Sequence, residues 1–266
     1  MLGTRMTDKI ELEFLLNEIE RESAAVEVGK SETLDFVTGD KAFLILEGEV
    51  VAFSGQNAKT GMSRTITLGK HDPIGFAEAI VSKSPSLRYV TNTEVKLLEV
   101  DAVALRKAIA GANILAATII RYIVARIFKE SQRSKNYLFE DEFIERNREI
   151  FLQARFAEGE QIFTPSTQVA KMFFIRSGNV EISTSDGIVL GALSVGECFG
   201  EAALLSDRKR KFTATAITKV HTIVIEKTLV LNEIKKNTIL VQLTALVLLK
   251  RMDIMNLLRL EKSREV

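Results

Sequence analysis

The segment from Phe199 to Ala216 combines residue types suited to holding a phosphate and a sugar. Gly200 lets the backbone approach a ligand closely. Residues 201–205 suit one short helical turn, whose free N–H groups attract an anion. Arg210 supplies a planar, permanently charged fork for phosphate oxygens, and Glu201 offers the acceptor that a sugar hydroxyl requires. The spacing therefore predicts a site for a sugar-phosphate anion.

An internal repeat indicates which elements position this segment. At an offset of 125, Leu68–Gly75 aligns with Leu193–Gly200, and the same offset continues without a gap to Ile109 and Ile234. Each aligned block has the pattern of a strand followed by a helix. The chain therefore holds two copies of one module.

The upstream blocks of the two copies align at a different offset. Ala42–Val50 matches Met172–Val180 at an offset of 130, so the first copy carries five extra residues between the blocks. These fit best in Ser54–Met62, where Gly, Asn and Ser favour a turn. We expect a lengthened hairpin loop at this point.

Each copy consists of short apolar or alternating runs, rich in Val, Ile, Phe and Thr and separated by glycine turns. This pattern predicts a mainly β chain with flanking helices, built from two tandem jelly-roll barrels. The expected domains are residues 1–135 and 136–266. Amphipathic spacing or apolar periodicity predicts helices over 11–20, 114–128, 140–154 and 240–260.

The anion-binding segment resembles the phosphate-binding cassette of the cyclic-nucleotide-binding family. The likeness lies in Phe199-Gly200-Glu201, an Ala-Leu-Leu run, and Arg210 ten residues after the glycine. That family includes catabolite activator proteins and protein-kinase regulatory subunits, and the repeat extends the likeness over most of the chain. The turn glycines Gly159, Gly178 and Gly196 resemble those of the family's barrel.

The resemblance assigns roles to the residues of the second copy. It implies that Glu201 accepts the ribose 2′-hydroxyl, that Arg210 binds the exocyclic phosphate oxygens, and that the amides of Ala202 and Ala203 cap the phosphate. It implies no catalysis and no cofactor, with cAMP or cGMP as the ligand. Lys211 stands where the family has a small residue that helps to select the purine, so the base stays open. The extra positive charge also leaves a cyclic dinucleotide open.

The first copy has lost the corresponding groups. In the ungapped alignment Phe76 replaces the glutamate and Pro85 replaces the arginine. Glu78 and Arg88 lie nearby in sequence and would substitute only if the loop were remodelled. We expect this copy to serve structure or partner contact rather than nucleotide binding.

Composition excludes several classes of protein. A formal net charge of +1 gives no general attraction to nucleic acid. The single cysteine, Cys198, allows no intramolecular disulfide and no thiolate metal site, which indicates a cytoplasmic protein. We expect Cys198 itself to be a small core residue. Charged residues interrupt every apolar run before it reaches membrane-spanning length. His71 and His221 are isolated, so no metal or catalytic role is assigned to them, and we expect no enzyme.

The expected function is a regulator that passes a nucleotide signal through the helix over 240–260 to an unidentified effector protein. This helix would cover its own barrel, or pair in a homodimer because its apolar stripe is dense. Two alternatives stay open. One is an adaptor with two degenerate barrels and no ligand, and the other is a transcription regulator without a recognisable DNA-binding domain.

Overall fold

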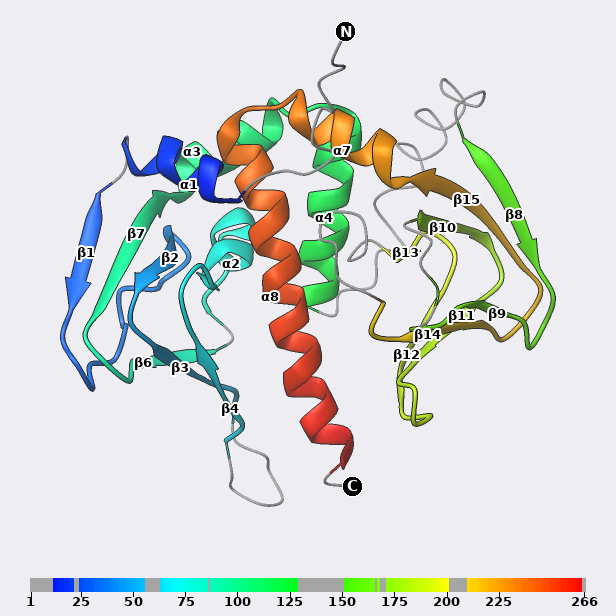
Figure 1. Ribbon diagram of the computed structural model, residues 1–266, viewed down its shortest axis with the longest axis horizontal. Coiled ribbons are helices and arrows are strands. Elements are labelled where there is room, and N and C mark those ends of the chain that lie inside the picture. Colours follow the sequence, from blue (N-terminus) through cyan, green and yellow to red (C-terminus); the bar gives the residue numbers. More distant parts are fainter. Residues whose placement is uncertain are drawn as a thin grey trace, which may run out of the picture. The chain divides into compact units, whose positions relative to one another are not determined.

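The computed structural model describes residues 12–21, 24–55, 63–85, 87–128, 151–165, 167, 171–200 and 210–264. It divides into two compact units that are discontinuous in sequence. One unit comprises Glu11–Ile127 with Asn237–Val266, and the other comprises Met1–Ile10 with Phe128–Lys236. Each unit contains one antiparallel β-barrel, coloured blue to green and green to orange in Figure 1.

The first barrel consists of two facing sheets with the strand orders β1-β7-β2-β5 and β4-β3-β6. All the pairs are antiparallel. The strands are β1 (Ala25–Val28), β2 (Lys41–Glu47), β3 (Val50–Phe53), β4 (Thr65–Leu68), β5 (Pro73–Ile74), β6 (Arg88–Thr91) and β7 (Val95–Asp101).

The second barrel repeats this arrangement with the strand orders β13-β10-β15-β8 and β12-β11-β14-β9. Its strands are β8 (Leu152–Phe156), β9 (Gln161–Phe163), β10 (Lys171–Ser177), β11 (Val180–Ser183), β12 (Val189–Leu193), β13 (Cys198–Phe199), β14 (Thr213–Ala216) and β15 (Val220–Glu226). The mainly β fold with two tandem jelly-roll barrels is therefore confirmed.

The hydrogen-bond ladders agree with both sequence offsets. Val50 pairs with Leu68 in the first barrel, and Val180 pairs with Leu193 in the second. The expected hairpin between β3 and β4 is confirmed, and the amide of Ser54 donates to the carbonyl of Arg64 at 2.8 Å to close its loop. Residues 56–62 of that loop lie outside the described residues.

The helices are α1 (Leu12–Glu20), α2 (Phe76–Val81), α3 (Ala102–Ala110), α4 (Ile114–Phe128), α7 (Lys227–Lys235) and α8 (Ile239–Arg264). The predictions for 11–20, 114–128 and 240–260 agree with α1, α4 and α8. The helix predicted over 140–154 is wrong at its end, because residues 152–154 lie in β8 and pair with β15. The start of that prediction falls outside the described residues. Among the described residues, none of the helices has the length and apolar character needed to cross a membrane.

The C-terminal helix α8 belongs to the same compact unit as the first barrel, in contrast to the expected boundary at residues 135 and 136. It contacts α1, α2, α3, β4 and β5 (Figure 1). Ile254 and Leu258 of α8 are buried within the apolar core of the first barrel. The sequence predicted that this helix covers the barrel that precedes it or pairs in a homodimer, whereas Ile254 and Leu258 lie in the core of the other barrel.

Candidate functional site

Gly200 directly follows β13 and has a backbone conformation that favours glycine. Its φ is +86°, and a Cβ added there would lie 2.7 Å from the carbonyl oxygen of Lys171 and 2.9 Å from Nη1 of Arg210. Both distances are shorter than any ordinary carbon contact, so a side chain at this position would displace the arginine. Gly200 therefore allows the guanidinium to lie directly against the backbone.

Arg210 lies against the second barrel although it is charged. Its side chain is only 8% exposed, and Nη2 donates a hydrogen bond to the carbonyl of Lys171 at 2.8 Å. The guanidinium carbon also lies 3.7 Å from the centre of the Phe163 ring. A ring face and a carbonyl both attract a cation, so these contacts hold Arg210 in one place at reduced cost of burial.

The aromatic residues beneath Arg210 form a connected stack. The rings of Phe173 and Phe199 are stacked with their centroids 5.0 Å apart, and Phe163 lies 5.8 Å from Phe199. All three rings are buried in the core of the second barrel. Cys198 beside them is buried, which agrees with the core position expected for it. Sequence reasoning did not identify Phe163, because nearly fifty residues separate it from Arg210.

The structure brings together some of the residues predicted for the site. Phe199, Gly200 and Arg210 meet at the end of β13, whereas the Lys211 side chain is exposed. Glu201, Ala202 and Ala203 fall outside the described residues. The described part of the site therefore contains the arginine expected to bind the phosphate oxygens, whereas the residues expected to bind the ribose and to cap the phosphate are not described.

The corresponding position in the first barrel retains the glycine and lacks the arginine. Gly75 has a φ of +74°, and a Cβ there would lie 3.2 Å from the carbonyl of Lys41, the counterpart of Lys171. Arg88 does not substitute for the missing arginine, because it is exposed and its guanidinium carbon lies 5.9 Å from the centre of the Phe53 ring.

Glu78 does not substitute for the missing glutamate either. Its carboxylate is fully buried and accepts a hydrogen bond from Nη2 of Arg251, in α8, at 3.0 Å. Burial raises the pKa of the neighbouring Tyr89 to about 12, and the charge of Arg251 partly opposes this shift. Glu78 is therefore paired with Arg251 rather than placed to bind a nucleotide.

Comparison with known protein families finds a match within the second barrel and α7. A family model described as the cyclic nucleotide-binding domain matches residues 153–237, which cover most of the second barrel and α7. This stretch of the second barrel therefore resembles a cyclic nucleotide-binding domain, in agreement with the likeness seen in the sequence.

Solved structures with some likeness to the chain include regulatory subunits of protein kinases. A cAMP-bound PfPKA-R fragment is 17% identical with a TM-score of 0.38, over 85% of this chain and 83% of that one. The regulatory subunit of a cAMP-independent protein kinase A from Trypanosoma cruzi, bound to guanosine, is 14% identical with a TM-score of 0.33, over 82% and 80%. The EAL enzyme Bd1971 in a half-site-occupied form is 30% identical with a TM-score of 0.34, over 40% and 98%.

Proposed function

We propose that the chain is a cytoplasmic, non-enzymatic regulator that binds one cyclic nucleotide in its second barrel. The observation that carries this proposal is the placement of Arg210. Its guanidinium is held over Phe163 and beside Gly200, at the end of the strand where the family's cassette begins. An arginine already fixed in this way needs little reordering to receive a phosphate.

The chemistry of the ligand follows from the groups that surround the site. A cyclic phosphate carries one negative charge, which a buried guanidinium stabilises more strongly than an exposed one. Glu201 would accept the ribose 2′-hydroxyl, and the amides of Ala202 and Ala203 would cap the phosphate. The base is adenine or guanine. Lys211 replaces the small residue that helps the family to select between these two purines, so the sequence does not favour one of them. A cyclic dinucleotide would use the same arginine and the added positive charge.

Covalent connectivity offers a route for the signal. β15 continues into α7, and only residues 236–238 separate α7 from α8. A ligand that favours one position of α7 would act through this short connection on the start of α8, by shifting the population of existing states. The effector protein would read this change at α8 or at the first barrel, and a homodimer stays a prediction.

Isothermal titration calorimetry with cAMP, cGMP and a cyclic dinucleotide tests the proposal. We expect one ligand to bind the wild-type chain. Arg210→Lys keeps the charge but loses the planar fork, so affinity should fall about 10- to 100-fold. Arg155→Lys, at an exposed position of β8, is the matched control and should bind as the wild type does. Absence of binding by all three ligands would contradict the proposal and favour the adaptor alternative.

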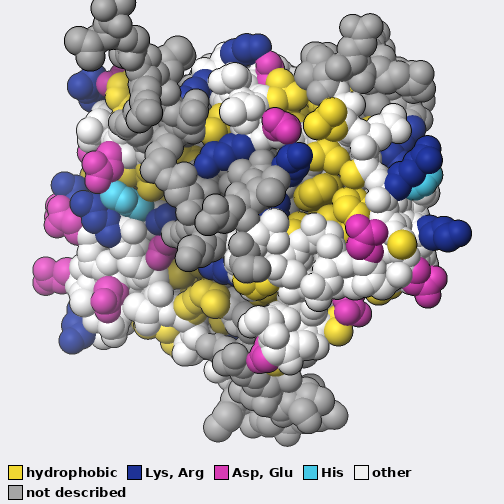
Figure 2. Space-filling view, turned by 45° about the vertical axis from the view of Figure 1, so that its right-hand side comes forward, with side chains coloured by type: hydrophobic (Ala, Val, Ile, Leu, Met, Phe, Trp, Pro, Cys, Tyr) yellow, Lys and Arg dark blue, Asp and Glu magenta, His cyan; other side chains and the backbone are white. Residues whose placement is uncertain are grey.

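The transcription regulator is the less favoured alternative. Residues 239–264 form one continuous helix rather than a helix-turn-helix. Among the coloured side chains of the described residues in Figure 2, Lys and Arg are interspersed with Asp and Glu rather than gathered into one basic surface. Salt-dependent binding to DNA in a filter assay would restore this alternative.

A further inference from the structure

The first barrel has aromatic residues at two positions where the aligned residues of the second barrel are not aromatic. Tyr89 of β6 occupies the position that Ala214 occupies in β14, and Phe76 stands in place of Glu201. Both aromatic side chains are buried. Ile254 and Leu258 of α8 complete the same core, and Met255 packs against it. In the second barrel, by contrast, the buried cluster around Phe173 and Phe199 consists of residues from the barrel strands.

The residues that α8 presents to the first barrel share one helical face. Arg251, Ile254, Met255 and Leu258 follow the spacing i, i+3, i+4 and i+7. Helices that bind in a groove of another protein use this spacing for their anchoring side chains. The contact is therefore a docked helix face rather than a scattered set of surface contacts.

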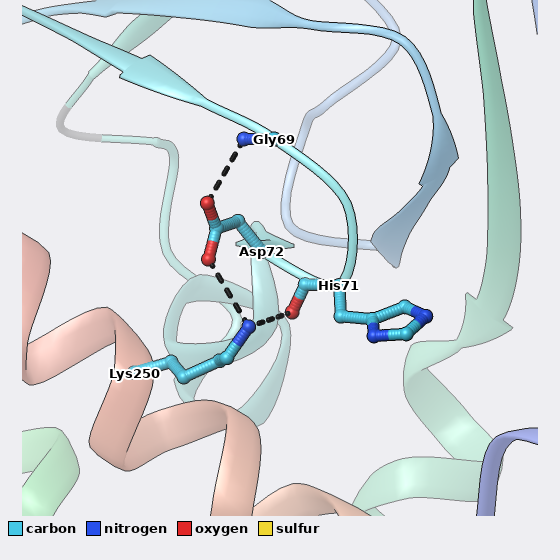
Figure 3. A network of polar contacts seen from close by, with 4 residues as sticks. All are labelled: Gly69, His71, Asp72 and Lys250. Atoms are coloured by element: carbon cyan, nitrogen blue, oxygen red, sulfur yellow. Dashed lines mark hydrogen bonds and ion pairs between the residues drawn. The ribbon is translucent and has the colours of Figure 1, made fainter. Parts of the chain in front are cut away.

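Two adjacent residues of α8 bind two different parts of the first barrel. Arg251 reaches Glu78 in α2, and both side chains are fully buried. Lys250 donates to the carbonyl of His71 at 3.0 Å and lies 3.3 Å from Oδ1 of Asp72, in the turn before β5 (Figure 3). The other carboxylate oxygen of Asp72 accepts from the amide of Gly69 at 2.9 Å. Two separate anchors fix the position of the helix along its axis as well as its rotation.

We propose that the first barrel is a helix-binding module and that α8 is the helix it binds. The helix contacts α2, which is the segment that a nucleotide would contact in a ligand-binding barrel. Glu78 lies in α2, the counterpart of the cassette segment at residues 201–205. Its buried carboxylate requires a positive partner, and Arg251 provides it. The first barrel is thereby closed to nucleotide, and its task is to receive the C-terminal helix.

The buried pair of Arg251 and Glu78 contributes more to the specificity of helix binding than to its strength. Nε and Nη1 of Arg251, Oε2 of Glu78 and the hydroxyl of Tyr89 have no hydrogen-bond partner among the described residues. A buried ion pair with unsatisfied atoms contributes little net stability, although removing one partner is costly. An apolar helix without an arginine at this position would leave Glu78 unpaired, and so would be rejected.

A double-mutant cycle in the full chain tests the proposal. The variants are Arg251→Met, Glu78→Leu and both together, with Arg155→Met at the exposed position in β8 as the matched control. Each single variant should lower the melting temperature by about 6–15 °C, because it leaves one buried charge without its partner. The double variant should return to within about 3 °C of the wild type, and the control should not differ from it.

Hydrogen exchange followed by mass spectrometry identifies the element that is released. In the wild type, the amides of α8 should be protected as strongly as those of β2 and β7. In Arg251→Met, α8 should exchange on the order of 100-fold faster, while β10 and β15 of the second barrel stay unchanged. If Arg251→Met does not fold, the double variant still gives the stability comparison.

Three results would overturn the proposal. They are additive losses in the double variant, rapid exchange of α8 in the wild type, and binding of two nucleotides per chain. If no nucleotide binds at all, the proposed function fails, whereas the docking of α8 is still decided by the cycle and by exchange.

Discussion

The two barrels share a strand order and differ in what fills them. Both have a left-handed glycine beside the carbonyl of an equivalent lysine, at Gly75 and at Gly200. In the second barrel this glycine accommodates Arg210. In the first barrel the arginine is absent, and a bulky Tyr89 and the α8 side chains occupy the interior. A barrel that lacks the charged residues of a ligand site therefore keeps its fold when apolar side chains occupy its interior.

The largest effect that would separate the barrels is expected at the shared glycine. Gly200→Ala should lower the free energy of unfolding by about 3 kcal/mol, because the methyl group adds left-handed strain and collides with Arg210. Gly75→Ala should cost about 1–2 kcal/mol, since its nearest contacts are 3.1 Å and longer. Urea unfolding measures both.

Gly159→Ala is the control for backbone strain alone. Gly159 has a φ of +80° and open space around it, so about 1 kcal/mol is expected. Equal costs at Gly200 and Gly159 would show that Arg210 does not lie against the Gly200 backbone.

Alkaline pH should weaken the first barrel through Tyr89. Burial raises the pKa of Tyr89 from 10.0 to about 12, so the fold favours the neutral phenol. This contribution is complete below pH 10 and is lost as the pH rises toward 12, up to about 3 kcal/mol. Tyr89→Phe should remove that loss. Thermal melts of both proteins between pH 9 and pH 12 compare them, and parallel curves would contradict the burial of this hydroxyl.

Phe163→Leu should weaken the ligand site of the second barrel. The substitution removes the ring face 3.7 Å from the Arg210 guanidinium, so nucleotide affinity should fall about 3- to 30-fold. Phe156→Leu removes a ring that packs edge-to-face on Phe173 instead. Calorimetry on both variants separates the two roles, because only the first should change affinity. Equal affinities would mean that the ring does not position the arginine.

The smallest expected effect is at the turn that binds Lys250. Partial burial, followed by the charges of Lys70 and Lys250, lowers the pKa of His71. The neutral ring is therefore favoured in the fold, and its contribution is present above pH 6.5 and lost as the pH falls below it. Solvent screening keeps the loss under about 1 kcal/mol. His71→Asn tolerates the positive φ and does not titrate, so its stability between pH 7 and pH 5 should fall less than that of the wild type.

Much of the fold was predictable because the repeat and the periodicity of each element can be read directly from the sequence. The offsets of 125 and 130 place equivalent strands on equivalent strands, and periodicity places α1, α4 and α8. The destination of α8 was not predictable in this way. It depends on contacts between residues more than 170 positions apart, such as Lys250 with Asp72. A glutamate within the apolar run of α2 was the available signal that a distant cation was needed.

The candidate site was predictable in part. Gly200 and Arg210 carry a recognisable spacing, so sequence alone identified them. Phe163 and the carbonyl of Lys171 were not identifiable, because a ring and a backbone oxygen carry no motif and become neighbours of Arg210 only when the strands pair.

The split of the first unit between residues 11–127 and 237–266 has a consequence for synthesis of the chain. The ribosome makes the strands of the first barrel before the second barrel, but it makes α8 only afterwards. Glu78 therefore has no Arg251 to pair with until more than a hundred intervening residues have been translated. Both barrels can complete their strand pairing during that interval, whereas α8 can pack onto the first barrel only at the end of synthesis.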